Sequence, residues 1–210
     1  MRPFGLLDTI ACPLPFANLD TDQILPARFL KRPRREGYGG FLLHDLRFGA
    51  DGEDVSSLSL DDPRYGGAEA IVARRNFGSG SSREGAVYAL ADFGIRCVIA
   101  PSFGDIFAQN CTMNGLLVVS LTEAQIEELL ASPEIVGAKP IRIDLEAQRI
   151  MCGDASYAFD IDPLRKTKLL NGWDDIDITL THAADIARFV ADDAKARPWA
   201  LPNRQGSASA

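Results

Sequence analysis

The sequence contains little histidine and little cysteine. In 210 residues there are two histidines and four cysteines, namely His44, His182, Cys12, Cys97, Cys111 and Cys152. No two cysteines form a C-x-x-C pair, and no zinc spacing is present. Scattered cysteines of this kind usually act as small, buried apolar side chains. We therefore expect this chain to bind no metal itself, and no iron–sulfur cluster, because a cluster needs grouped thiolates.

Long apolar runs and excess positive charge are also missing. No run of about 18 apolar residues exists, so no transmembrane helix is expected. Proline, aspartate and cysteine interrupt the first 20 residues, where a signal peptide needs an unbroken apolar stretch. The net charge of −7 disfavours general nucleic-acid binding. We expect a cytoplasmic protein whose partners are neither membranes nor nucleic acids.

What is present is the composition of an ordinary globular domain, 46% hydrophobic and 24% charged. The middle of the chain alternates two kinds of pattern. Short runs rich in Ile, Leu and Val predict buried strands, and longer segments with helical spacing predict helices. The strands are predicted at 69–75, 97–100 and 116–121, and the helices at 83–94, 103–115 and 122–132. Such alternation implies right-handed βαβ crossovers and a partly parallel sheet.

The two ends of the chain differ from this middle part. The first 25 residues predict a short strand and a loop, residues 28–40 a basic, Gly-rich loop, and residues 49–67 an irregular excursion. Alternation over 139–162 predicts two or three antiparallel strands, and two helices are expected near 162–171 and 181–195. The expected fold is therefore α/β, with a mixed, partly parallel sheet flanked by helices. We expect one domain over 1–196 and a flexible tail over 197–210.

A Gly/Ser-rich turn, "NFGSGSSREGA" (76–86), joins a predicted strand to a predicted helix. The first N–H groups of a helix have no partner within the helix, its dipole favours negative charge, and Gly78 and Gly80 permit close backbone approach. No Lys-Ser/Thr follows, as a P-loop requires, and Arg83 stands where a dinucleotide fingerprint needs its third glycine. A guanidinium binds a carboxylate through two parallel hydrogen bonds. The turn therefore predicts a carboxylate substrate.

Ser81 lies two residues before Arg83, where the helix dipole and the guanidinium could both stabilise an alkoxide that accepts a proton. A second interpretation is purely structural. Ser81 and Glu84 have the spacing of a capping box, and Arg83 would then be a solvated first-turn side chain. Thr21 and Asp22 likewise have a structural interpretation, as part of a turn or helix cap.

Four blocks of sequence, in this order, resemble the small subunits of 3-isopropylmalate dehydratase, which correspond to the swivelling fourth domain of the aconitases. These blocks are "ANLDTDQILPARFL" (17–30), "GGFLLHDLRF" (39–48), "NFGSGSSREGA" followed by "VIAPSFGDIFAQN" (98–110), and "IDPLRKTKLLNGWDDIDITL" (161–180). The resemblance extends over roughly residues 5 to 195. It implies an aconitase-like swivelling β/β/α domain.

The resemblance also implies roles for particular residues. The first serine of the family's G-S-S-R-E motif is the catalytic base, which is Ser81 here, and the arginine that binds a substrate carboxylate is Arg83. The Thr-Asp pair that lines the family's active site is Thr21 and Asp22. Two further candidates for substrate binding are Ser82 and Arg28, the latter in a loop that the family associates with substrate choice and that we expect to act as a mobile lid.

The activity implied is that of a hydro-lyase of leucine biosynthesis, which interconverts 2-isopropylmalate and 3-isopropylmalate through isopropylmaleate. It needs a separate large subunit that carries a [4Fe–4S] cluster acting as a Lewis acid. Two positions depart from the family: Gly85 replaces a common histidine, and Ser79 a cysteine found in many bacterial members. A paralogue acting on citramalate, dimethylmalate or homoaconitate therefore stays open, as does a non-catalytic carboxylate-binding domain.

Overall fold

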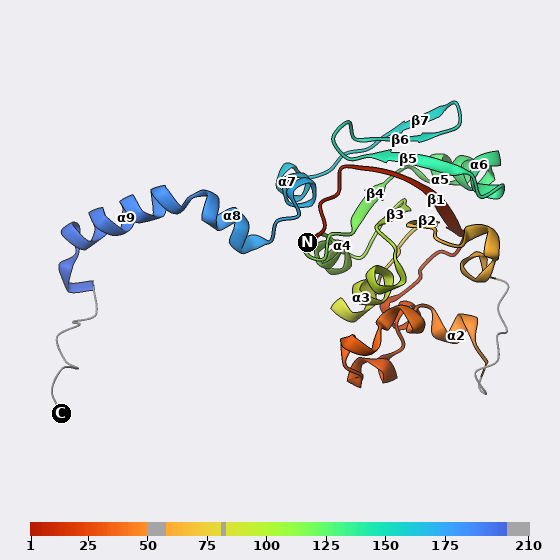
Figure 1. Cartoon of the computed structure of the whole chain (residues 1–210), viewed down its shortest axis with the longest axis horizontal. Coiled ribbons are helices and arrows are strands. Elements are labelled where there is room, and N and C mark those ends of the chain that lie inside the picture. Colours follow the sequence, from red (N-terminus) through yellow and green to blue (C-terminus); the bar gives the residue numbers. More distant parts are fainter. Residues whose placement is uncertain (50–57, 81–82, 201–210) are drawn as a thin grey trace. The chain divides into compact units, whose positions relative to one another are not determined.

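The computed structural model describes residues 1–49, 58–80 and 83–200, and within them the chain forms a seven-stranded sheet (Figure 1). The order across the sheet is β4-β3-β2-β1-β5-β6-β7. The strands are β1 Leu6–Leu14, β2 Ala70–Ala73, β3 Cys97–Ala100, β4 Leu117–Ser120, β5 Pro140–Asp144, β6 Arg149–Cys152 and β7 Ala155–Ala158. Neighbours among β1–β4 are parallel, and the pairs from β1·β5 to β6·β7 are antiparallel. The predicted mixed, partly parallel α/β sheet is confirmed.

Helices cover both faces of the parallel half of the sheet (Figure 1). The helices α3 Glu84–Phe93 and α4 Asp105–Met113 connect β2 to β3 and β3 to β4 on one face. The helices α5 Glu123–Ala131 and α6 Pro133–Val136 cover the other. All four residues of both β2 and β3 are buried, as expected of parallel strands enclosed on two sides.

Each face of the sheet packs against its own apolar core, and successive residues of a strand alternate between the two cores. Ile71 and Val98 belong to the core with α3 and α4, whereas Val72 and Ile99 belong to the core with α5 and α6. This division follows from the two-residue side-chain period of a strand.

The ends of the predicted helices are confirmed by their caps. Helix α3 ends at Gly94, which adopts a positive φ of 110° that favours glycine. Thr122 and Gln125 form the expected capping box of α5. Helix α7 Pro163–Asn171 begins after the cap Asp162 and ends at Gly172.

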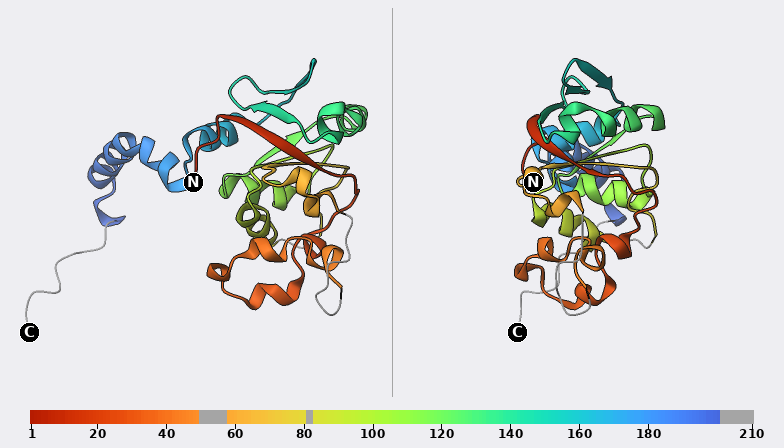
Figure 2. Two further views of the ribbon diagram at one scale, coloured as in Figure 1. Left: turned by 45° about the vertical axis from the view of Figure 1, so that its right-hand side comes forward. Right: turned by 90° about the vertical axis from the view of Figure 1, so that its right-hand side faces the viewer.

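The basic, Gly-rich part of the sequence is not the loop that was expected. It folds into three 3₁₀ helices, Ala27–Lys31, Arg34–Glu36 and Tyr38–Phe41, between the short helices α1 Thr21–Ile24 and α2 His44–Arg47. We call residues 27–41 the basic segment. It lies beside α3, as Figure 2 shows in orange next to yellow-green. The loop prediction was wrong because this segment gains its order from packing on α3, a contact that local sequence does not encode.

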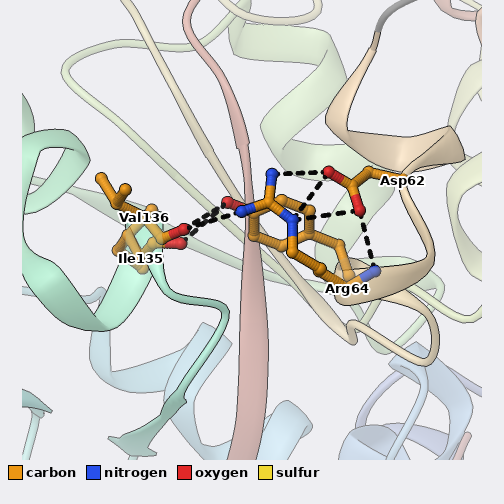
Figure 3. A network of polar contacts seen from close by, with 5 residues as sticks. Asp62, Arg64, Ile135 and Val136 are labelled. Carbon is orange, nitrogen blue, oxygen red and sulfur yellow. Dashed lines mark hydrogen bonds and ion pairs between the residues drawn. The ribbon is translucent and has the colours of Figure 1, made fainter.

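Residues 58–67 are joined to α6 across the end of the sheet (Figure 3). Two 3₁₀ helices, Ser59–Asp61 and Pro63–Tyr65, replace the irregular excursion expected here. Arg64 donates to Asp62 and, at 3.5 Å, to the carbonyl of Val136, while the Tyr65 hydroxyl donates to the carbonyl of Ile135 at 2.9 Å. Residues 50–57 of the expected excursion lie outside the described residues.

The chain divides into two compact units, Met1–Gly172 and Trp173–Ala210. The second contains α8 Asp175–Thr181, α9 Ala183–Ala196 and the 3₁₀ helix Pro198–Ala200. The boundary expected after residue 196 stays a prediction, and most of the expected tail, 201–210, lies outside the described residues. Within the described ranges, no helix combines the length and apolar character needed to cross a bilayer.

Candidate active site

The N-terminal motif and the Gly/Ser-rich turn meet beyond the carboxyl ends of β1 and β2. The Gly78 N–H donates to the carbonyl of Leu19 at 2.7 Å, and the Thr21 N–H donates to that of Ser79 at 2.8 Å. Asp20 and Ser79 form an isolated parallel bridge. Backbone hydrogen bonds therefore hold two segments together that lie about sixty residues apart in the sequence.

A third segment, after β3, joins the same turn. The Phe77 N–H donates to the carbonyl of Ser102, and the Gly104 N–H to that of Phe77, both at 3.0 Å. The Asn76 N–H donates to Ser102 Oγ at 2.9 Å. Three loops thus converge at the carboxyl edge of the parallel strands, which is where open α/β sheets bind their ligands.

Glycine is required at this convergence for steric reasons. Gly78 has a φ of 70°, and a Cβ there would overlap the ring of Phe107. A Cβ on Gly104 would lie 2.5 Å from the carbonyl oxygen of Gly78. Side chains at these positions would force the loops apart.

Arg83 is the N-cap residue of α3, and its Nη1 donates to Oδ1 of Asp22 in an ion pair. The Arg83 side chain is 24% exposed and that of Asp22 50%, so both remain reachable from solvent. The neighbouring Thr21 is buried. The structure therefore brings together three of the predicted site residues, Thr21, Asp22 and Arg83.

Ser81 and Ser82 lie outside the described residues, so their roles stay predictions. The start of α3 bears on the capping-box interpretation alone. Arg83 has extended backbone (φ −126°, ψ 108°), and Glu84 is the first helical residue. A capping box would need Glu84 at the third helical position. The capping-box interpretation was therefore wrong.

Arg28 points to α2. Its Nη1 donates to Asp45 Oδ2 at 2.7 Å, and its Nη2 also contacts Asp45 and lies 3.2 Å from His44 Nδ1. This guanidinium, with His44, holds the pKa of the Asp45 carboxyl below its usual range. No contact of Arg28 with Arg83 or Asp22 is seen among the described residues, so its role in substrate binding stays a prediction.

All four cysteines are buried free thiols. Burial raises the pKa of the Cys12 thiol to about 12 and also raises the pKa of Cys97 and of Cys111. Thiols in this state are poor ligands, because metal coordination requires the thiolate. In the described part of the chain, no group of three or more His, Cys, Asp or Glu side chains is placed to hold a metal ion.

Sequence reasoning missed the asparagines that shape the site. Asn18 and Asn76 both have a positive φ, of 59° and 62°, and Asn76 Nδ2 donates to Asn18 Oδ1 at 2.9 Å. Asparagine adopts this conformation more readily than most residues. The available signal was position: Asn18 is the second residue of the N-terminal block 17–30, and Asn76 is the first residue of the Gly/Ser-rich turn, directly after the strand predicted at 69–75.

Comparisons with known proteins agree with this fold. The family described as the aconitase C-terminal domain matches residues 1–124. The fold is also that of a crystal structure of 3-isopropylmalate dehydratase from Methanocaldococcus jannaschii, with a TM-score of 0.62 and 23% identity over 87% of this chain and 98% of that one. The fold and site thus define a domain of the aconitase C-terminal class.

Curated relatives identify the family within this class of domains. Proteins named 3-isopropylmalate dehydratase small subunit are 46% identical over 200 residues in Jannaschia sp. (strain CCS1), 45% over 202 in Rhodospirillum centenum, and 46% over 200 in Caulobacter vibrioides. These matches cover 95–96% of this chain and 98–100% of the relatives. The chain belongs to the 3-isopropylmalate dehydratase small-subunit family of hydro-lyases, which confirms the resemblance.

Proposed function

We propose that this chain is the small subunit of a two-component hydro-lyase that interconverts 2- and 3-isopropylmalate in the cytoplasm, as part of leucine biosynthesis. The observation that carries the proposal is the partly exposed Arg83–Asp22 pair at the carboxyl edge of the sheet, beside the Gly78–Gly80 turn. The names of relatives that match along nearly the whole chain support the substrate.

Arg83 binds a substrate carboxylate in this proposal. Its backbone is fixed at the start of α3, and Asp22 holds one terminal nitrogen of its guanidinium. A planar guanidinium oriented in this way can present further N–H groups to a carboxylate as a pair. Asp22 and Thr21 complete the wall of the site, with Ser82 and Arg28 as further substrate-binding candidates.

Ser81 acts as the base. It takes the proton from the substrate carbon next to the one that carries the hydroxyl, and isopropylmaleate forms as the hydroxyl leaves as hydroxide, which takes up a proton from solvent to become water. Addition of water in the opposite orientation, with the proton returned to the other carbon, gives the isomer. The start of α3 and the Arg83 charge both favour the alkoxide form of a serine two residues before Arg83.

The buried, protonated cysteines of this chain do not fit a cluster site. The proposal therefore places the [4Fe–4S] cluster on the large subunit, where it would supply Lewis acidity toward the substrate hydroxyl. This chain's own part is to orient the dicarboxylate, to move the proton, and to exclude water at the joint site.

The proposal is tested by co-expressing the chain with a large subunit and following isopropylmaleate hydration from the loss of alkene absorbance. We expect Ser81→Ala to abolish turnover without preventing assembly, because only the base is removed. Arg83→Lys keeps the charge but loses the paired hydrogen bonds, and we expect it to raise KM about tenfold or more. Ser156→Ala, at an exposed position on β7, is the matched control. Full activity of Ser81→Ala would exclude Ser81 as the base.

A second candidate is favoured by one position, Gly85, where the family commonly has histidine. The chain would then be a paralogous hydratase for another 2-hydroxy dicarboxylate. Rates with isopropylmaleate, citraconate, dimethylmaleate and cis-homoaconitate decide between the two candidates. No turnover with any of them, in an assembled complex with an intact cluster, would leave a non-catalytic carboxylate-binding domain.

A further inference from the structure

We propose that Gly85 is a positioning residue, whose missing side chain forms a seat for Leu30 and so holds the basic segment against the helix that carries Arg83. The packing of Leu30 on Gly85 is inferred from contacts within this chain alone. Its effect on substrate affinity rests on the proposed function.

The backbone conformation at position 85 does not require glycine. Gly85 is the second residue of α3, is buried, and does not have a positive φ. Glycine is disfavoured inside helices relative to alanine, so its presence calls for a packing reason. A Cβ at this position would lie 2.7 Å from Leu30 Cδ2 and 2.9 Å from Leu25 Cδ2, both too close for real contacts.

The two leucines at Gly85 are not equally free to move. Leu25 is 1% exposed and belongs to the core beneath α3. Leu30 is 39% exposed and lies on the first 3₁₀ helix of the basic segment. An added methyl group would therefore displace the Leu30 side chain rather than Leu25, and weaken the packing of the basic segment on α3.

The far end of the basic segment is fixed to the other end of α3. A Cβ on Gly39 would lie 2.7 Å from backbone atoms of Asp92 and Phe93, so the two backbones touch. Arg34 Nη2 donates to Asp92 Oδ1 at 2.9 Å and its guanidinium lies 3.9 Å from the centre of the Tyr88 ring. With this end fixed, Gly85 controls how closely the beginning of the segment approaches α3.

That beginning is the part of the segment near the site. Leu30 follows Arg28 by two residues, and Gly85 follows Arg83 by two. Loosening Leu30 would therefore leave the basic side chains that flank it, Arg28 and Lys31, less firmly placed beside the start of α3. A dicarboxylate substrate would lose favourable charge in its ground state and in its transition state alike, which raises KM more than it lowers kcat.

The first test uses limited trypsin digestion of the full chain. Arg28, Lys31, Arg34 and Arg35 are cleavage sites in the basic segment, whereas Arg32 precedes a proline. We expect Gly85→Ala to speed cleavage in this segment about fivefold, because local opening becomes easier. Gly5→Ala is the matched control, since the same methyl group there meets no atom within 4 Å.

The decisive variant combines Gly85→Ala with Leu30→Val. It adds one carbon at position 85 and removes one from the side chain at position 30 that packs against it. We expect this pair to restore slow cleavage, a result that a general loss of helix stability would not give. Should Gly85→Ala fail to fold, Leu30→Ala empties the seat without touching α3 and should give the same fast cleavage. If Gly85→Ala and Leu30→Ala were both cleaved at the wild-type rate, the proposed packing of Leu30 on Gly85 would be overturned.

The second test measures kinetics of the complex with the large subunit. We expect Gly85→Ala to raise KM about fivefold with a smaller change in kcat, and the double variant to recover the wild-type KM. Fast cleavage with unchanged KM would overturn the link between the seat and substrate binding. Fast cleavage in a complex whose wild type turns over no substrate would support the seating and contradict the proposed function.

Discussion

At the scale of single residues, Arg28 and Asp45 show how a surface pair can orient one side chain of the basic segment. Asp45 lies on α2 and accepts from both terminal nitrogens of Arg28. Because both side chains are about half exposed, the pair adds little to global stability. Its effect is geometric, since it fixes the direction of the Arg28 side chain, which the sequence analysis named as a substrate-binding candidate.

Removing the arginine should be visible in the titration of Asp45. We expect Arg28→Gln to raise the pKa of Asp45 toward its ordinary value of 3.8, because the hydrogen bonds from Arg28 are the largest cause of its lowered pKa. A lowered pKa means that the pair stabilises the fold at pH values above the ordinary pKa of 3.8. This stabilisation is lost as the pH falls through the lowered pKa. Carboxyl-carbon NMR titration measures the shift. Arg34→Gln, whose partner is Asp92, should leave Asp45 unchanged, and an unmoved Asp45 in Arg28→Gln would contradict the pairing.

The sequence predicted part of the site because two motifs each contained chemically distinctive residues. Arg83 followed from the turn, and Thr21 and Asp22 from the resemblance. The structure brings these residues together, and their roles stay predictions. The partnership of Arg28 with Asp45 could not be predicted. It depends on how three 3₁₀ helices fold the chain back over the 17 positions that separate Asp45 from Arg28.

At the scale of elements, the closest backbone approach in the basic segment lies at Gly39 and the end of α3. We expect Gly39→Ala to destabilise the protein by about 1–3 kcal/mol, because the new methyl group meets rigid helix backbone instead of a movable side-chain end. The free energy of unfolding in urea measures the effect. Gly40→Ala is a close control, since a Cβ there meets nothing within 4 Å and should change stability by about 0.5 kcal/mol or less. Equal stability of the two variants would argue against this contact.

Elements with strong local signals were predicted well, and elements that depend on distant contacts were not. Strand β3 matches its prediction at 97–100, and α5 begins at the predicted cap, because apolar period and capping chemistry are local properties. Strand β1 is longer than the short strand expected, and it occupies the centre of the sheet. Its length follows from having a parallel neighbour on one side and an antiparallel neighbour on the other, which its own residues do not reveal.

At the scale of the whole molecule, every buried residue of the two cores comes from the first compact unit. The two core clusters begin at Phe4 and end at Leu169, and the helices α8 and α9 contribute no buried residue. The hydrophobic stabilisation of the sheet therefore resides in residues 1–172. The second unit, by contrast, contains helices of 7 and 14 residues, lengths at which isolated helices are marginal in water.

A chain ending at Gly172 should consequently keep its stability. We expect its free energy of unfolding in urea to lie within about 1 kcal/mol of the full chain, because no core residue is removed. The new terminal carboxylate would also replace the Gly172 carbonyl that accepts from the Met1 amino group at 2.8 Å. A chain ending at Thr167 is the matched comparison. It loses Leu169, which is 1% exposed and whose carbonyl accepts from the Phe4 N–H, and should be less stable by about 2–5 kcal/mol. Equal losses in the two truncated chains would show that the second unit contributes to the stability of the sheet.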